Sequence, residues 1–191
     1  MSEKDESSPF RGATIQHIHG NIFLGPGNGV EQLVHEAFES RDALGTEMRI
    51  GILDVADDYP EWSHHRDVLF VHAGLNDGPE DWEAPWGGHN SPTAYLNAIQ
   101  ALDFLADKQS AVYVHCHSGV SRSCFVVCLY FWWVYREKFE DIIEAVNRRY
   151  GRVHIHPKHL DRLPHLQELL RVMPGSRCPL YWRDKIGSLV E

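Results

Sequence analysis

Short apolar runs along the chain alternate with longer segments of helical periodicity. Runs with the period of two residues that is typical of strands, or apolar throughout, predict five strands. They are Thr14 to Leu24, which a turn at Gly20-Asn21 divides into two strands, Met48 to Val55, Val68 to Ala73, and Ala111 to Val114. The runs at 48–55 and 68–73 are both predicted to be buried.

Apolar residues recur at helical spacing in five other segments. These are Gly29 to Ala43, a segment that starts at Ser91-Pro92, Cys124 to Tyr135, Phe139 to Tyr150, and Pro157 to Val172. Ser91 followed by a proline is a typical helix start. The segment Cys124 to Tyr135 is apolar all round but much shorter than the ~20 residues that span a bilayer. We therefore expect it to be a core helix that includes Trp132 and Trp133.

Strands that alternate with helices predict one α/β domain with a central, mostly parallel sheet of about five strands and helices on both faces. Residues 1–12 are charged and rich in serine, and they are predicted to be a mobile N-terminal arm. Residues 13–172 form the expected folded domain. Residues 173–191 form a C-terminal extension that is too apolar for a solvated tail, so we expect it to pack on the domain or on a partner.

Composition and charge narrow the classes of function. The formal net charge of −9 argues against a nucleic acid or an anionic membrane as the main partner. The four cysteines lack the regular spacing of a disulfide framework, and the first residues contain no apolar stretch that would predict secretion. These features favour a reducing, cytoplasmic location, which the sequence does not distinguish from the nucleus. The oligomeric state is not predicted.

The segment His115 to Ser123 joins the last predicted strand to the core helix. A strand, a tight loop and a helix start meet at Cys116, so loop N–H groups and the positive end of the helix dipole favour a phosphate and a thiolate there. Arg122 lies across the loop, where its planar fork can take two phosphoryl oxygens. Ser123 can donate its hydroxyl to the sulfur, and Gly119 suits a loop that needs positive φ.

The order His-Cys, five residues, Arg and Ser resembles the signature of cysteine-dependent phosphatases, and the Ser-Arg-Ser ending resembles the dual-specificity branch. The resemblance implies a protein tyrosine phosphatase-like fold and a phosphocysteine intermediate, without a cofactor or a metal. Cys116 is then the nucleophile and Arg122 the phosphate clamp, while His115 tunes the cysteine and Ser123 assists the departing thiolate. The substrate-binding loop is His117, Ser118, Gly119, Val120, Ser121 and Arg122. By the order of its elements the resemblance covers residues 13–172, which it implies to be a dual-specificity phosphatase-like catalytic domain, but at residue level only Val114 to Ser123 is specific.

The same resemblance implies an aspartic acid that protonates the leaving oxygen. The candidates are Asp77, Glu80, Asp81 and Glu83. Asp77 is favoured because it follows the strand at 68–73 in a turn, whereas Asp81 is nearer the spacing of the family. The segment Glu80 to Asn90 is predicted to be an insertion, whose tryptophans either face the substrate or anchor the loop.

The sequence also allows alternative interpretations, namely a metal site and other classes of substrate. The 13 histidines include the pairs His64-His65, His115 with His117, and His154 with His156, but none has the spacing of a known zinc site. The loop lacks lysine, so a phosphoprotein that carries phosphotyrosine or phosphoserine/threonine is favoured over a phosphoinositide or an RNA end. A phosphoglucan, and a phospho-residue binding module without turnover, remain alternatives. Lys158 stands where the family usually has asparagine.

Overall fold

The computed structural model describes residues 15–31, 33, 49–57, 68–76 and 90–175. They contain a five-stranded sheet with the strand order β1-β2-β5-β3-β4. The strands are β1 (Gln16–His19), β2 (Ile22–Pro26), β3 (Ile50–Asp54), β4 (Val68–His72) and β5 (Ala111–Cys116). β1 pairs with β2 in the antiparallel sense, and the other neighbours are parallel. The predicted mostly parallel sheet is therefore confirmed.

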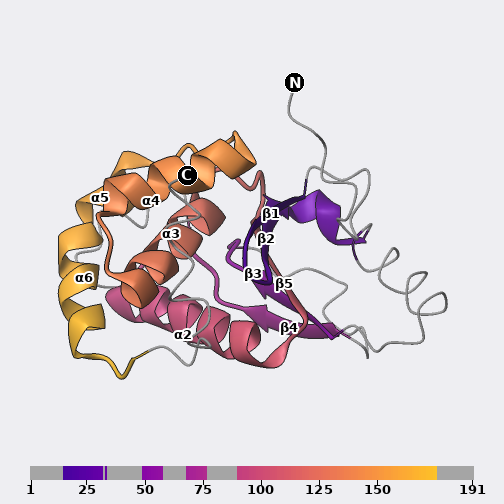
Figure 1. Ribbon diagram of the computed structural model, residues 1–191, viewed down its shortest axis with the longest axis horizontal. Helices are drawn as coiled ribbons and strands as arrows, with labels where there is room; N and C mark the ends of the chain where they lie inside the picture. Colours follow the sequence, from indigo (N-terminus) through magenta and orange to yellow (C-terminus); the bar gives the residue numbers. More distant parts are fainter. Residues whose placement is uncertain (1–14, 32, 34–48, 58–67, 77–89, 176–191) are drawn as a thin grey trace.

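Five helices of the described residues lie on one side of this sheet (Figure 1). They are α2 (Pro92–Lys108), α3 (Arg122–Tyr135), α4 (Phe139–Tyr150), α5 (Pro157–Asp161) and α6 (Leu163–Val172). The short helix η1 (Gly27–Gly29) and the helical residues Val30, Glu31 and Leu33 continue from β2, and Val30 and Leu33 cover the opposite face. The fold is thus the predicted α/β arrangement.

β5 lies at the centre of the sheet, and its side chains divide the core in two. Val112, Val114 and Cys116 join the larger cluster under the helices, whereas Ala111 and Tyr113 join the smaller cluster on the other face. This division follows from the alternation of side chains along a strand. The nucleophile candidate therefore lies on the helical face.

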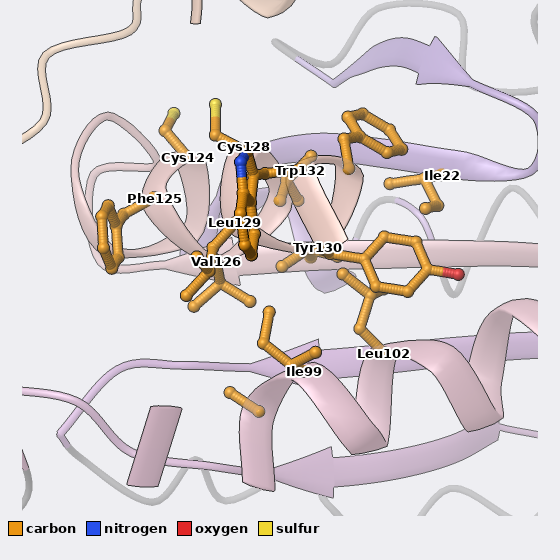
Figure 2. Packing of buried hydrophobic residues seen from close by; sticks show 14 of the residues in the cluster. Ile22, Ile99, Leu102, Cys124, Phe125, Val126, Cys128, Leu129, Tyr130 and Trp132 are labelled. Atoms are coloured by element: carbon orange, nitrogen blue, oxygen red, sulfur yellow. The ribbon is translucent and has the colours of Figure 1, made fainter. Parts of the chain in front are cut away.

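α3 is the core helix that its composition predicts. Every residue from Arg122 to Val134 is buried, and in Figure 2 Val126 points toward Ile99 of α2 while Cys124 and Cys128 point to another side of α3. Trp132 and Trp133 are 6% and 5% exposed. Because other parts of the protein surround the helix, they hold its N-terminal end in position next to the loop that precedes it.

Several element boundaries match the predictions closely. α2 begins at Pro92, and the Ser91 side chain accepts a hydrogen bond from the Ala94 N–H. α4 spans the predicted residues Phe139–Tyr150. α3 begins at Arg122, two residues before the apolar run that predicted it.

Two predictions are wrong. β4 is not buried, since most of its residues are partly accessible and Leu69 is 38% exposed. It is the outer neighbour of β3 in the described sheet, and edge strands keep partial contact with solvent. The single helix expected over Pro157 to Val172 is two helices that meet at Arg162. Pro164 explains the break, because proline lacks an N–H and restricts the residue before it.

Other predictions lie wholly or mostly outside the described residues. These are the N-terminal arm at 1–12, most of the helix Gly29 to Ala43, and the C-terminal extension beyond residue 175. Within the described ranges, no helix is both long and apolar enough to cross a membrane.

Candidate active site

The predicted phosphate loop connects the central strand to the core helix. β5 ends at Cys116, and α3 begins at Arg122 with Ser121 as its N-cap residue. Cys116 is 1% exposed, whereas His117 and Ser118 are exposed to solvent. The positive end of the α3 dipole lies at this loop, as it does in backbone sites that bind anions.

The carbonyl groups of this loop are turned outward. Four of them accept hydrogen bonds from donors outside the loop: His115 from Val55 N at 2.9 Å, His117 from Gly27 N at 3.0 Å, Gly119 from Cys124 Sγ at 3.3 Å, and Val120 from His154 N at 2.8 Å. A planar trans peptide holds the following N–H opposite to its carbonyl. The N–H groups of Ser118, Val120 and Ser121, which follow the three carbonyls within the loop, therefore point away from those donors.

Gly119 allows the loop to pack directly on the strand next to it. Its φ is +71°, and a Cβ at this position would lie 2.5 Å from the backbone carbon and oxygen of Gly25. A side chain at position 119 would therefore meet both backbone strain and a collision. Gly25 belongs to β2, so the loop rests on the backbone of the strand beside β5.

Cys116 and Ser123 are in contact. The Sγ and Oγ atoms are 3.3 Å apart, and the Ser123 side chain is fully buried. Either atom can be the donor, so the hydroxyl is placed to donate to a thiolate. The other described cysteines, Cys124 and Cys128, are fully buried among apolar side chains, and burial raises the pKa of both thiols. The predicted packing role of this pair is confirmed.

Arg122 is almost completely buried, with 4% of its surface exposed. Its Nη1 atom donates to Asp57 Oδ1 at 2.6 Å and to the Leu75 carbonyl at 2.8 Å. Asp57 follows β3, and Leu75 follows β4. The arginine therefore connects the phosphate loop to the ends of two neighbouring strands.

These contacts favour the ionised form of the Asp57 carboxyl group. Burial would raise the pKa of Asp57, but the hydrogen bond from Arg122 and the positive charges of Arg122 and His117 lower it below its ordinary value of 3.8. Asp57 is therefore ionised at neutral pH. A general acid must carry a proton when substrate binds, so Asp57 does not suit that role.

Asp54 lies in a row with two histidines at the same end of the sheet. His72 and His115 are its register partners on the two neighbouring strands. Asp54 Oδ2 is 3.1 Å from His72 Nδ1, and Oδ1 is 3.6 Å from His115 Nδ1. Oδ1 also accepts the Ala56 N–H at 2.8 Å. The buried Asp54 side chain thus lies beside His115, the residue that precedes Cys116.

The segment that holds the general-acid candidates is joined at its two ends. The Asn76 N–H donates to Asn90 Oδ1 at 3.1 Å, and Asn90 Nδ2 donates to the Asn76 carbonyl at 2.8 Å. Arg162 Nη1 donates to the Asn90 carbonyl. Asp77, Glu80, Asp81 and Glu83 lie between these asparagines, outside the described residues, as do the tryptophans of the inserted segment.

The structure brings together the predicted residues His115, Cys116, Arg122 and Ser123 and the loop between them. The sequence analysis missed Asp54, Asp57 and the Leu75 carbonyl. The sequence does contain a signal for Asp54, because a charged residue at the end of an otherwise apolar strand is unusual. The roles of Asp57 and Leu75 depend on contacts that no local pattern encodes. Among the residues that the structure describes, no group of three or more His, Cys, Asp or Glu side chains is arranged to hold a metal ion.

Solved structures share this fold at low sequence identity. DUSP15 is 16% identical, with a TM-score of 0.61 over 84% of this chain and 97% of its own. PTPMT1 in complex with PI(5)P is 21% identical, with a TM-score of 0.55 over 82% of this chain and 96% of its own. The human tyrosine phosphatase-like serine/threonine/tyrosine-interacting protein is 16% identical, with a TM-score of 0.58 over 83% of this chain and 98% of its own.

No curated protein sequence matches the chain significantly. The family model for the dual specificity phosphatase catalytic domain does match, over residues 53–168. The match covers more than half of the chain: it begins at the end of β3, includes β4, β5, the loop after β5 and helices α2 to α5, and ends within α6. The chain belongs to the dual specificity phosphatase family.

Proposed function

We propose that this phosphatase domain hydrolyses phosphotyrosine and phosphoserine/threonine monoesters of proteins through a phosphocysteine intermediate. The observation that carries the proposal is the loop around Cys116, where the carbonyls of His115, His117, Gly119 and Val120 accept hydrogen bonds from donors outside the loop. Such a loop presents N–H groups to a phosphoryl group directly above a thiolate.

The reaction has two steps. The Cys116 thiolate forms a bond to phosphorus, and the bond from phosphorus to the ester oxygen breaks as Asp77 gives that oxygen its proton. Water then attacks phosphorus and gives a proton to the Asp77 carboxylate left by the first step, the S–P bond breaks, and the thiolate leaves with a hydrogen bond from Ser123. Arg122 and the loop N–H groups hold the phosphoryl oxygens in both steps.

A phosphoprotein is the favoured substrate because residues 117–121 carry no lysine. A polyanionic headgroup would gain from extra cations near the phosphate. The fold is shared with PTPMT1, whose structure contains PI(5)P, so a phosphoinositide is the second candidate. We further propose that the protein works in the cytoplasm or the nucleus, where a buried thiol stays reduced.

The covalent mechanism is tested with Cys116→Ser and a matched control. Cys128→Ala removes another buried thiol, which lies in α3 away from the loop. We expect Cys116→Ser to lose turnover of p-nitrophenyl phosphate but still bind inorganic phosphate, because the loop and Arg122 remain. Cys128→Ala should keep turnover in its folded fraction. Substantial turnover by pure Cys116→Ser would exclude the covalent route.

The substrate class is tested by release of phosphate from a panel of substrates. Phosphotyrosyl and phosphoseryl/threonyl peptides, phosphoinositide vesicles and phosphoglucan are compared at equal phosphate concentration, with Cys116→Ser as the blank. We expect the highest kcat/KM on phosphopeptides. Higher kcat/KM on phosphoinositide vesicles would replace the phosphoprotein proposal by a lipid substrate.

A further inference from the structure

The guanidinium of Arg122 is held at one nitrogen by two different segments. Nη1 carries two N–H groups, and it donates to both Asp57 Oδ1, at 2.6 Å, and the Leu75 carbonyl, at 2.8 Å. A bidentate contact with a phosphoryl group needs two neighbouring nitrogens on one edge. Because both hydrogens of Nη1 have protein acceptors, that edge is the one formed by Nε and Nη2.

The two acceptors are themselves fixed by the sheet. Leu75 N donates to the Val55 carbonyl at 3.2 Å, and Ala73 N donates to the Asp54 carbonyl at 2.8 Å. The segment after β4 is thereby attached to the end of β3, from which Asp57 follows by three residues. The Leu75 side chain is fully buried. These contacts give the Leu75 carbonyl a defined position relative to the end of β3.

A carboxylate beside a phosphate-binding arginine can have one of two opposite effects. It competes with phosphate if it occupies the guanidinium edge that phosphate needs, and it orients the arginine if it binds a different edge. Asp57 contacts Nη1, on the side of the guanidinium away from the Nε and Nη2 edge. An arginine side chain carries about 2 kcal/mol of rotamer entropy. Contacts that hold it in one orientation before substrate arrives reduce the entropy lost on binding.

We propose that Asp57 is a positioning residue, which together with the Leu75 carbonyl orients Arg122 so that Nε and Nη2 bind the phosphoryl oxygens. The proposal deepens the proposed function and rests on it. It assigns a role in phosphate binding to a residue outside the loop motif, at the end of β3.

The test measures binding of inorganic phosphate to the full chain by calorimetry. Asp57→Ala removes the acceptor and the charge, whereas Asp57→Asn removes the charge but keeps an oxygen that can accept from Nη1. We expect Asp57→Ala to weaken binding about 10-fold, the usual worth of a hydrogen bond to a charged group. Asp57→Asn should lie between wild type and Asp57→Ala. Asp141→Asn, a loss of one charge at an exposed position of α4, should bind like wild type.

Turnover of p-nitrophenyl phosphate separates this proposal from the proposed function. kcat/KM should fall in the same order as phosphate affinity, while the melting temperature of each variant shows that it is folded. Phosphate binding by Asp57→Ala that equals or exceeds that of wild type overturns the positioning role, even when wild type is an active phosphatase. A graded loss of phosphate binding in a protein without turnover supports the positioning role and rejects the proposed function.

Discussion

At the scale of single residues, the site depends on positions where backbone shape and charge leave little freedom. Gly119 is one of them, because positive φ and the close approach of Gly25 occur at the same residue. Asp57 is another, because its charge is tied to Arg122. Neither residue contacts the phosphoryl group through a side chain in the proposed mechanism, yet each controls the shape of the loop or of its clamp.

Gly119→Ala should destabilise the protein by more than about 1 kcal/mol, the cost of a non-glycine residue in a sparsely populated backbone region. The added Cβ would also lie 2.5 Å from the Gly25 backbone. Gly151→Ala is the matched control, since Gly151 has φ +72° but nothing within 4 Å of the added Cβ. Urea unfolding should show the larger loss for Gly119→Ala. Equal losses in the two variants would show that the collision is relieved without cost.

The ion pair of Asp57 should make stability depend on pH. The pKa of Asp57 is lowered in the folded state, so its ionised form stabilises the fold above the ordinary value of 3.8, and this stabilisation is lost as pH falls through the folded pKa. In urea unfolding, the free energy of unfolding of wild type should exceed that of Asp57→Asn at pH 7. The difference between the two free energies should shrink below about pH 4. A difference that grows toward acid pH would contradict the ionised assignment.

At the scale of elements, three segments that follow the ends of strands meet around Arg122. The loop after β5 supplies Arg122 itself, the segment after β3 supplies Asp57, and the segment after β4 supplies the Leu75 carbonyl. Parallel strands end at the same edge of a sheet, so residues far apart in sequence converge there. The segment after β4 continues into the residues that contain the general-acid candidates.

Asn90→Ala should lower the free energy of unfolding by about 1–3 kcal/mol, because it removes the buried side chain that pairs with both backbone groups of Asn76. Asn97→Ala, at an exposed position in the middle of α2, is the control and should change stability by less than about 0.5 kcal/mol. Unfolding in urea measures both variants. An effect of Asn90→Ala as small as that of the control would mean that water replaces the side chain.

Asp77→Asn should slow hydrolysis of tyrosyl and alkyl phosphates by about 10²–10⁴-fold, the usual worth of a positioned acid. An activated aryl phosphate has a better leaving group, so its rate should fall much less. The alkaline limb of the pH profile, which reports loss of the proton of the acid, should flatten. Asp81→Asn serves as the control. If the leaving-group sensitivity appears in Asp81→Asn instead, Asp81 is the acid.

At the scale of the whole molecule, β5 and the site at its end lie between the larger and the smaller hydrophobic cluster of the core. The larger cluster fixes α3 and Cys116 from one face, and Tyr113 belongs to the smaller cluster on the other face. Tyr113 stacks on His115 and donates to the Pro26 carbonyl at 2.6 Å. The strand that ends in the nucleophile is therefore supported on both faces.

The chemistry of the whole protein should need no metal. The proposed mechanism uses a thiolate, an arginine and a carboxylic acid, so chelator should leave kcat/KM unchanged, whereas vanadate and thiol oxidants should inhibit. The measurement is turnover of p-nitrophenyl phosphate before and after dialysis against chelator. Activity lost in chelator and restored by zinc would favour a histidine metal site instead.

Local sequence signals determined most of the elements and the loop. Strand and helix periods, the Ser91-Pro92 helix start, and the spacing from Cys116 to Arg122 each depend on residues close together in the chain. These signals act through backbone geometry within one turn or one strand. The predicted strands, the core helix and the place of the loop between Cys116 and Arg122 therefore agree with the structure.

Tertiary structure decided what surrounds those elements. Asp57 and Leu75 contact Arg122 from 65 and 47 positions away in sequence. The partial exposure of β4 follows from its place in the strand order, and the histidine partners of Asp54 follow from strand register. Such contacts form only when the carboxyl ends of parallel strands converge at one edge of the sheet, so no local pattern contains them.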